Sequence, residues 1–237
     1  MSYSLINVMK QAPSLVSLVL LAPAVLLVAC ASGPRPPDWQ LEAKGAIERS
    51  VTAYLEGNSR VAAAELARAR SQLSRTGRAD LLATAELLHC AARVASLVFE
   101  PCAGFESLRL DATPAQRAYA DYLRGQAVPA DNMALLPQAQ RAPARGDVDA
   151  LISMADPLAQ LLAAGVLLQT GRASPAVITQ AIDTASSQGW RRPLLAWLGV
   201  QAQRAEQGGD AEAAARLRRR MAIAQESSPV IQVPQKE

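Results

Sequence analysis

The fold is decided in residues 38–74, which read DWQLEAKGAIERSVTAYLEGNSRVAAAELARARSQLS. Asp38 is a favourable N-cap, and apolar residues recur after it at roughly helical spacing, so we expect a helix over 38–56. Gly57 ends that helix, and Asn58 or Ser59 caps a second one that continues to Ser74. Two amphipathic helices joined by so short a turn predict an antiparallel helical hairpin.

The same start and stop signals recur along the rest of the chain. A third, more apolar helix is expected over 79–99, because Pro101 ends it. Later helices begin where a capping residue precedes a proline, at Thr113, Asp156 and Ser174. Asp210 opens a last helix to about residue 225, and no segment has the pattern of a strand. We therefore predict an all-α domain over 38–226, in which the proline-containing residues 126–146 form a long loop or a partly disordered hinge.

The composition narrows the class of protein. Half of the 237 residues are apolar, 19% are charged, and the formal net charge is only +3. So many apolar residues exclude a disordered chain, and so small a net charge excludes a dedicated nucleic-acid binder. Only one stretch approaches the length of a bilayer, which excludes a protein with several membrane spans.

That stretch lies before the helical region. It runs from Ser14 to Ala29, follows the basic Lys10, and is interrupted by Pro23. It is shorter than the roughly 20 residues that span hydrocarbon. A basic residue, a short apolar core and small residues at its end are typical of a secretory signal. An uncleaved signal anchor is the alternative.

The apolar run ends in Leu27-Val28-Ala29-Cys30, which resembles the lipobox of bacterial lipoproteins. The resemblance implies that a signal peptidase cuts between Ala29 and Cys30 and removes residues 1–29. It also implies that the Cys30 thiol receives a diacylglyceryl group and that the new amine is acylated. Several acyl chains hold a protein stably on a membrane, whereas one holds it only marginally.

The residues after Cys30 bear on where the anchor lies. Ala31 stands where retention in the inner membrane would use Asp, so the resemblance implies the periplasmic face of the outer membrane. Residues 30–37 are rich in proline and favour extended backbone, so we expect them to form a short tether between the bilayer and the domain.

A second resemblance concerns the helical region. A Gly is followed five, nine and twelve residues later by Ala, a large apolar residue and Ala at Gly57, Ala62, Leu66 and Ala69, and in part at Gly208, Ala213 and Leu217. This spacing resembles the tetratricopeptide repeat and implies antiparallel helical hairpins stacked in an array, with small residues at the close crossings. The match is imperfect, because Arg220 replaces the last Ala. An irregular helical bundle is the alternative.

Cys90 and Cys102 remain once Cys30 is lipidated. In an oxidising periplasm two such thiols usually pair, and Pro101 allows the chain to fold back along the helix that carries Cys90. We predict a disulfide that pins this turn. Two buried free thiols are the alternative, since a metal site lacks further ligands at suitable spacing.

The sequence offers little that could carry out chemistry. His89, the only histidine, lies in an apolar helix, and no Gly-x-Ser-x-Gly elbow, phosphate-binding loop or metal motif accompanies it. Asp147 and Asp149 would point to different sides of a helix, as helix-start charges do. We predict no catalytic residue, no metal, no cofactor and no small-molecule substrate.

Three other features are candidates for binding. Arg216, Arg218, Arg219 and Arg220 make a basic end to the last helix, which is either a solvated face or a contact for lipid headgroups or an acidic partner. Trp190 and Trp197 share a helix face, either in the core or along a ligand groove. The tail 227–237 is expected to fray, although Val230–Val233 have the character of a strand that adds to a partner's sheet.

These features predict an outer-membrane-anchored periplasmic lipoprotein that is not an enzyme and that acts as a protein-binding adaptor or assembly factor of the cell envelope. The chain resembles tetratricopeptide lipoproteins that serve outer-membrane protein insertion, secretin piloting or regulation of cell-wall synthesis, and also uncharacterised lipoproteins of proteobacteria. A structural envelope spacer without a specific client is the alternative, followed by a peptidoglycan-acting enzyme. The sequence assigns no partner and no binding residue.

Overall fold

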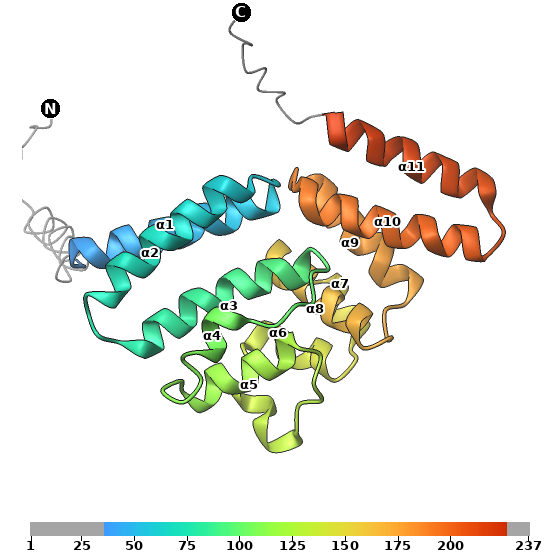
Figure 1. Ribbon diagram of the computed structural model, residues 1–237. Helices are drawn as coiled ribbons and strands as arrows, with labels where there is room; N and C mark the ends of the chain where they lie inside the picture. Colours follow the sequence, from blue (N-terminus) through green and yellow to red (C-terminus); the bar gives the residue numbers. More distant parts are fainter. Residues whose placement is uncertain (1–35, 227–237) are drawn as a thin grey trace, which may run out of the picture. The chain divides into compact units, whose positions relative to one another are not determined.

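The computed structural model describes residues 36–226, and every regular element in that range is helical (Figure 1). The helices of the first half are α1 (Asp38–Leu55), α2 (Ser59–Ser74), α3 (Ala79–Ala95), α4 (Ala103–Glu106) and α5 (Pro114–Leu123). The 3₁₀ helix η3 (Ala130–Leu135) follows, and then α6 (Gln138–Ala144), α7 (Val148–Ile152), α8 (Pro157–Gln169), α9 (Pro175–Ser187), α10 (Arg191–Gln207) and α11 (Ala211–Glu226). The prediction of an all-α fold is confirmed.

Some predictions fall on residues outside this range. The lipobox with its cleavage point, most of the tether and the tail 227–237 lie outside the described residues. Between residues 36 and 226, none of the helices combines the length and the apolar character that crossing a bilayer requires.

α1 and α2 form the predicted hairpin and lie side by side in Figure 1. Gly57 adopts a positive φ of 90° in the turn, a conformation that L side chains rarely adopt. The Asn58 side chain then caps α2 by accepting a hydrogen bond of 3.3 Å from the backbone N–H of Val61. Between the two helices the buried Ser50 hydroxyl donates to the carbonyl of Ala62 over 2.8 Å. Local capping and one buried polar contact therefore fix the hairpin.

α3 is the helix that most other elements of the first half contact. It packs against α1, α2, α4 and α5, and also against α8 from the second half. The contact with α8 is close because Gly165 faces the α3 backbone, where a Cβ atom on Gly165 would lie 2.5 Å from the carbonyl oxygen of Val94. A small residue at this crossing is therefore a condition of the fold.

Two residues of α10, Arg192 and Trp197, connect this helix with earlier parts of the chain. Trp197 is fully buried in the core formed with α8 and α9. Arg192 reaches the turn between α1 and α2, where its Nε donates to the carbonyl of Tyr54 over 2.7 Å and its guanidinium lies 4.2 Å from the centre of the Tyr54 ring. The Arg192 contacts hold the start of α10 against the first hairpin.

The third helix is shorter than predicted. α3 ends at Ala95 rather than at Phe99, because Leu97 adopts a φ of 60° and turns the backbone out of the helix. The N–H of Val98 then bonds back to the carbonyl of Arg93 over 2.9 Å, as in a Schellman cap. A leucine in the left-handed region is uncommon, so no sequence signal marks this end.

The prediction for residues 126–146 is wrong, because this segment is neither a long loop nor a disordered hinge. It contains η3 and α6, and Pro143 lies inside α6. Buried Gln140 anchors the segment by accepting from the Tyr122 hydroxyl at 2.9 Å and donating to the carbonyl of Ala159 at 3.0 Å. Long-range hydrogen bonds thus order a stretch whose prolines predict irregularity.

The residues of the repeat pattern differ in burial. Ala62, Leu66 and Ala69 are buried in the first hairpin, as a close helix crossing requires. In the last hairpin Leu217 is buried, but Ala213 is only half-buried. The regular stacking of tetratricopeptide hairpins therefore stays a prediction.

Candidate functional site

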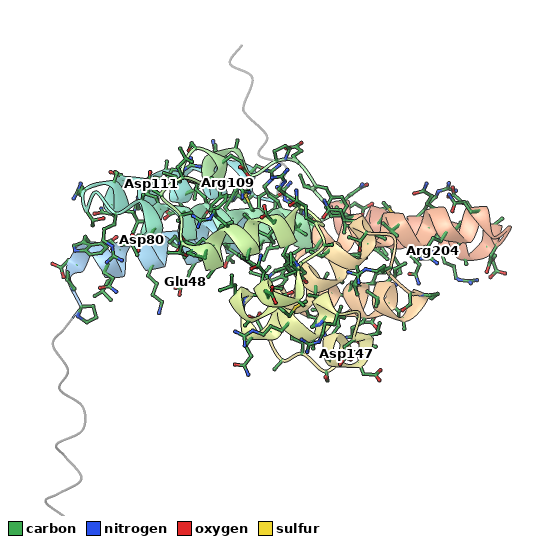
Figure 2. All side chains as sticks on the ribbon, turned by 90° about the horizontal axis from the view of Figure 1, so that it is seen from below. Glu48, Asp80, Arg109, Asp111, Asp147 and Arg204 are labelled. Atoms are coloured by element: carbon green, nitrogen blue, oxygen red, sulfur yellow. A yellow bond between two sulfur atoms is a disulfide. The ribbon has the colours of Figure 1, made fainter. Side chains whose placement is uncertain are left out.

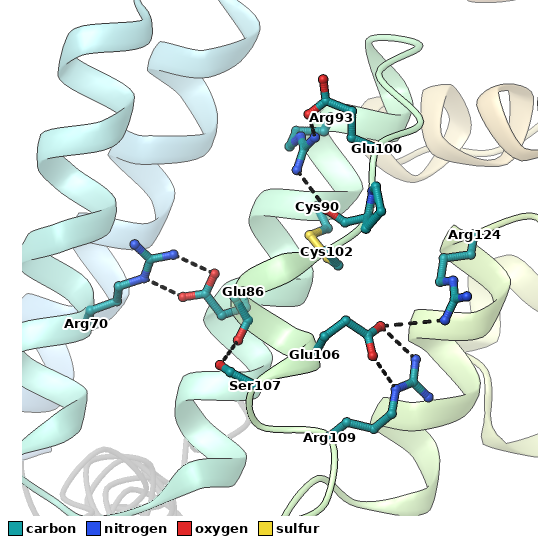
Figure 3. The surroundings of a disulfide bond; sticks show 12 residues. Arg70, Glu86, Cys90, Arg93, Glu100, Cys102, Glu106, Ser107, Arg109 and Arg124 are labelled. Atoms are coloured by element: carbon teal, nitrogen blue, oxygen red, sulfur yellow. Dashed lines mark hydrogen bonds and ion pairs between the residues drawn. A yellow bond between two sulfur atoms is a disulfide. The ribbon is translucent and has the colours of Figure 1, made fainter.

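Cys90 on α3 and Cys102 at the start of α4 are joined as a disulfide, with their Cα atoms 6.0 Å apart (Figure 3). Arg93 braces the same turn by donating to the carbonyl of Pro101 over 3.4 Å and pairing with Glu100 over 2.5 Å. Both cysteines are buried. The bridge thus serves to hold α4 against α3, and it is not exposed for exchange with another thiol.

Glu86 lies one turn before Cys90 on α3 and is almost fully buried. Its carboxylate accepts two hydrogen bonds from the guanidinium of Arg70 on α2, one of them 2.7 Å long (Figure 3). A Cβ atom on Gly104 would lie 2.0 Å from the carboxylate, so a larger residue at this position would displace the Glu86 side chain. This pair of an exposed arginine and a buried glutamate connects α2 with α3 beside the start of α4.

His89 is half-buried on α3, with its ring edge-on to that of Tyr54 at 5.4 Å between centroids. Burial lowers the pKa of His89 below its ordinary 6.5, and the nearby Arg93 lowers it further. Its Nδ1 has no hydrogen-bond partner among the described residues. The ring thus packs against Tyr54, which is a structural contact.

Asp147 and the titratable groups near it do not gather into a site. Asp147 caps α7 by accepting from the N–H of Ala150 at 2.9 Å, and Asp149 lies in the first turn of that helix, as expected of helix-start charges (Figure 2). Across residues 36–226, no three His, Cys, Asp or Glu side chains lie together as the ligands of a metal would.

An apolar groove runs along α3 and is made of two neighbouring hollows. The first, with a volume of about 510 Å³, lies between α3, α5, the η3–α6 segment and the start of α8. The second, of about 310 Å³, lies between α3, the start of α1 and the end of α2. Thr84 and Leu88 line both hollows. We call the two together the α3 groove.

The walls of the α3 groove are mainly apolar. Large apolar side chains line it from end to end: Trp39, Ile47, Leu81, Leu88, Tyr119, Leu135 and Leu158. Leu88 lies at the junction of the hollows and keeps 36% of its surface exposed. An exposed leucine flanked by other apolar side chains on a concave face is typical of a surface that binds another protein.

Several polar groups at the edges of the groove have partners within the chain. Gln116 donates to the carbonyl of Asp80 at 2.7 Å and to the hydroxyl of Thr84 at 2.9 Å. The Arg141 guanidinium donates to two backbone carbonyls, and Lys44 pairs with Glu48 at 3.8 Å. The groove therefore presents no excess of charge and no activated nucleophile, and it is suited to an apolar ligand surface.

A separate hollow, distinct from the α3 groove, lies where α9, α10 and α11 meet. Its volume is about 520 Å³, and Ile178, Ala205 and Leu217 form its apolar floor. Three arginines line it, namely Arg204, Arg216 and Arg220, and no acidic residue does. Figure 2 labels Arg204 at this end of the described chain. We call this site the basic hollow.

The structure separates the arginines that the sequence groups together. Arg216 and Arg220 line the basic hollow, whereas Arg218 pairs with Glu206 of α10 and Arg219 does not line the hollow. Trp197 belongs to the core, and Trp190 packs against that core at the start of α10. Neither tryptophan lines the α3 groove or the basic hollow, so the interpretation of both as core residues holds.

Sequence reasoning missed the residues of the α3 groove. Leu88 and Leu81 look like ordinary core leucines in an apolar helix, and Trp39 follows directly after a cap. Only the arrangement of α1, α5 and α8 around α3 leaves them accessible. The one available signal was the number of leucines in α3, which exceeds what one buried face needs.

Comparison with known proteins adds no assignment: no family model, no curated protein and no solved structure matches this chain.

Proposed function

We propose that the protein is an adaptor or assembly factor of the cell envelope, held on the periplasmic face of the outer membrane by a lipidated Cys30, and that the α3 groove is its docking site for another envelope protein. The anchor rests on the lipobox resemblance of Leu27-Val28-Ala29-Cys30. The docking role rests on one observation, the two apolar hollows that share Leu88 as a lining residue.

The chemistry of the groove favours an amphipathic helix as the occupant. The described residues form no strand, so a partner cannot add a strand to a sheet edge here and must bind through side chains. The stretch of α3 from Leu81 to Ala91 that lines the groove is about 15 Å long at 1.5 Å per residue, which matches about three turns of a partner helix. Because the edges carry no excess charge, the partner surface is apolar rather than strongly ionic.

Capture after mild cross-linking tests the proposal. The mature, detergent-solubilised protein is compared with Leu88→Asp, which places a charge at the junction of the two hollows. Leu110→Asp is the matched control, because Leu110 is 97% exposed and lies outside the groove. We expect one envelope protein to be captured by the wild type and by Leu110→Asp, and to be lost with Leu88→Asp.

The anchor is tested separately with Cys30→Ser. The proposal expects the wild type in the outer-membrane fraction with a mass increase from acylation, and the variant in the soluble periplasmic fraction. An unacylated chain that still carries its apolar leader would contradict the anchor. Capture that is equal for Leu88→Asp and Leu110→Asp would contradict the groove and favour a structural spacer.

A further inference from the structure

The basic hollow is a second surface with a chemistry of its own. Its floor is apolar, since Ile178 and Leu217 are buried side chains that form its base. Its rim is cationic, since Arg204, Arg216 and Arg220 are all exposed. It shares no lining residue with the α3 groove, so whatever it binds is independent of the function proposed above.

The charges of the hollow are only partly balanced within the chain. Arg216 pairs with Glu212, its neighbour one turn away on α11. Arg204 donates to the carbonyl of Ala173 at 3.3 Å, but no carboxylate of residues 36–226 forms an ion pair with Arg204 or Arg220. Like charges around one hollow repel each other, and an anionic ligand would relieve that repulsion.

We propose that the basic hollow binds an acidic, partly apolar segment of another protein, with carboxylates on Arg204 and Arg220 and a large apolar side chain on the floor between them. Guanidinium groups bind carboxylates through paired, charge-assisted hydrogen bonds. The floor of Ile178, Ala205 and Leu217 can contact an apolar side chain of the ligand. A purely ionic ligand has no such side chain and would leave the floor uncovered. A carboxylate beside an apolar residue in one segment satisfies both parts.

The shape of the site favours a peptide segment over a membrane surface. The arginines line a hollow formed by three helices, α9, α10 and α11. A bilayer is flat on this scale and does not enter a hollow, whereas a side chain of a peptide does. An anionic membrane is therefore the competing ligand that the experiment must separate.

A random 12-residue peptide library displayed on phage provides the probe. It is selected against the soluble Cys30→Ser chain, and the best peptide is then measured by fluorescence anisotropy against Arg220→Glu and Arg219→Glu. Both variants replace Arg by Glu and therefore change the net charge equally. Arg219 is on the same helix as Arg220 but does not line the hollow. Circular dichroism checks that both fold.

We expect the selection to enrich peptides that combine Asp or Glu with Leu, Ile, Val or Phe. We expect Arg220→Glu to weaken the best peptide about tenfold or more, since a charge-assisted contact becomes a repulsion. Arg219→Glu should change the affinity by less than about twofold. Enrichment without acidic residues, or equal weakening by the two variants, would overturn the proposal. So would binding to phosphatidylglycerol vesicles that Arg220→Glu abolishes while no acidic peptide is enriched.

Discussion

The indole N–H of Trp197 donates a hydrogen bond of 3.2 Å to the carbonyl oxygen of Ala95, and both residues are fully buried. Ala95 is the last residue of α3, where the carbonyls no longer find a partner within the helix. Trp197 lies a full hundred residues further along the chain, in the middle of α10. The Trp197 side chain therefore supplies a hydrogen-bond donor to the buried carbonyl at the end of α3 and also fills the core between α8, α9 and α10.

Trp197→Phe should lower the free energy of unfolding by about 1–3 kcal/mol, because it leaves the Ala95 carbonyl buried without a donor. Trp190→Phe is the matched control, since Trp190 is only half-buried and its indole N–H forms no hydrogen bond with residues 36–226. Urea unfolding followed by circular dichroism measures both. Equal losses in the two variants would show that the hydrogen bond contributes nothing beyond ring burial.

Gly165→Ala should also destabilise the domain, by about 1–3 kcal/mol, because its Cβ would lie 2.5 Å from the Val94 carbonyl and force α3 and α8 apart. Gly199→Ala serves as the control within α10, where a Cβ would be 3.9 Å from the nearest atom, the Met221 Cε. That control should gain up to about 1 kcal/mol from helix propensity. Opposite signs in thermal unfolding are the expected result, and a loss in both variants would contradict the close crossing.

Replacing both members of the disulfide with alanine should lower the free energy of unfolding by about 3 kcal/mol, the loop-entropy estimate for a separation of this size. The comparison is made in the Cys30→Ser background, with and without reductant. We expect the reductant to destabilise only the chain that retains Cys90 and Cys102. A chain that is indifferent to reductant would mean that the two thiols are not joined.

We expect the free energy of unfolding to depend on pH through the titration of His89. Its folded pKa is lowered mainly by burial and then by the charge of Arg93, while the charge of Glu86 opposes the shift and Arg70 and Arg192 add smaller lowering contributions. The unfolded chain therefore binds the proton more readily. This contribution to stability is complete above pH about 6.5 and is lost as the pH falls from there toward the folded pKa.

The measurement is the free energy of unfolding between about pH 7.5 and pH 5 for the wild type and His89→Gln. We expect the wild type to lose more stability over that interval, because glutamine does not titrate. Parallel curves for the two chains would show that His89 has the same pKa in both states.

The two hairpins at the ends of the domain could be predicted because their signals are local. Asn58 caps α2 through its own side chain, and Asp210 accepts from the N–H of Ala213 to start α11. Glycines in left-handed turns, such as Gly57 and Gly209, mark where the helices before them end. Each of these signals acts within a few residues, so the sequence shows it directly.

The rest depends on contacts between distant residues. Gln140 orders α6 only because Tyr122 and Ala159 are brought beside it, and Leu97 turns without any residue that favours the left-handed region. The α3 groove exists because α1, α5 and α8 surround α3 without covering Leu88. A single sequence contains no measure of such uncovered surface, so the pattern that predicts a core helix also describes a docking face.

Site-specific photo-cross-linking at position 88 tests the central claim most directly. A photoreactive benzoylphenylalanine replaces Leu88 in one chain and Leu110 in another, and both are irradiated in intact cells. Docking in the α3 groove predicts one cross-linked product of defined mass from position 88, containing an apolar helical segment of an envelope protein, and none from position 110. Absence of a product from position 88, or the same products from both positions, would contradict the account.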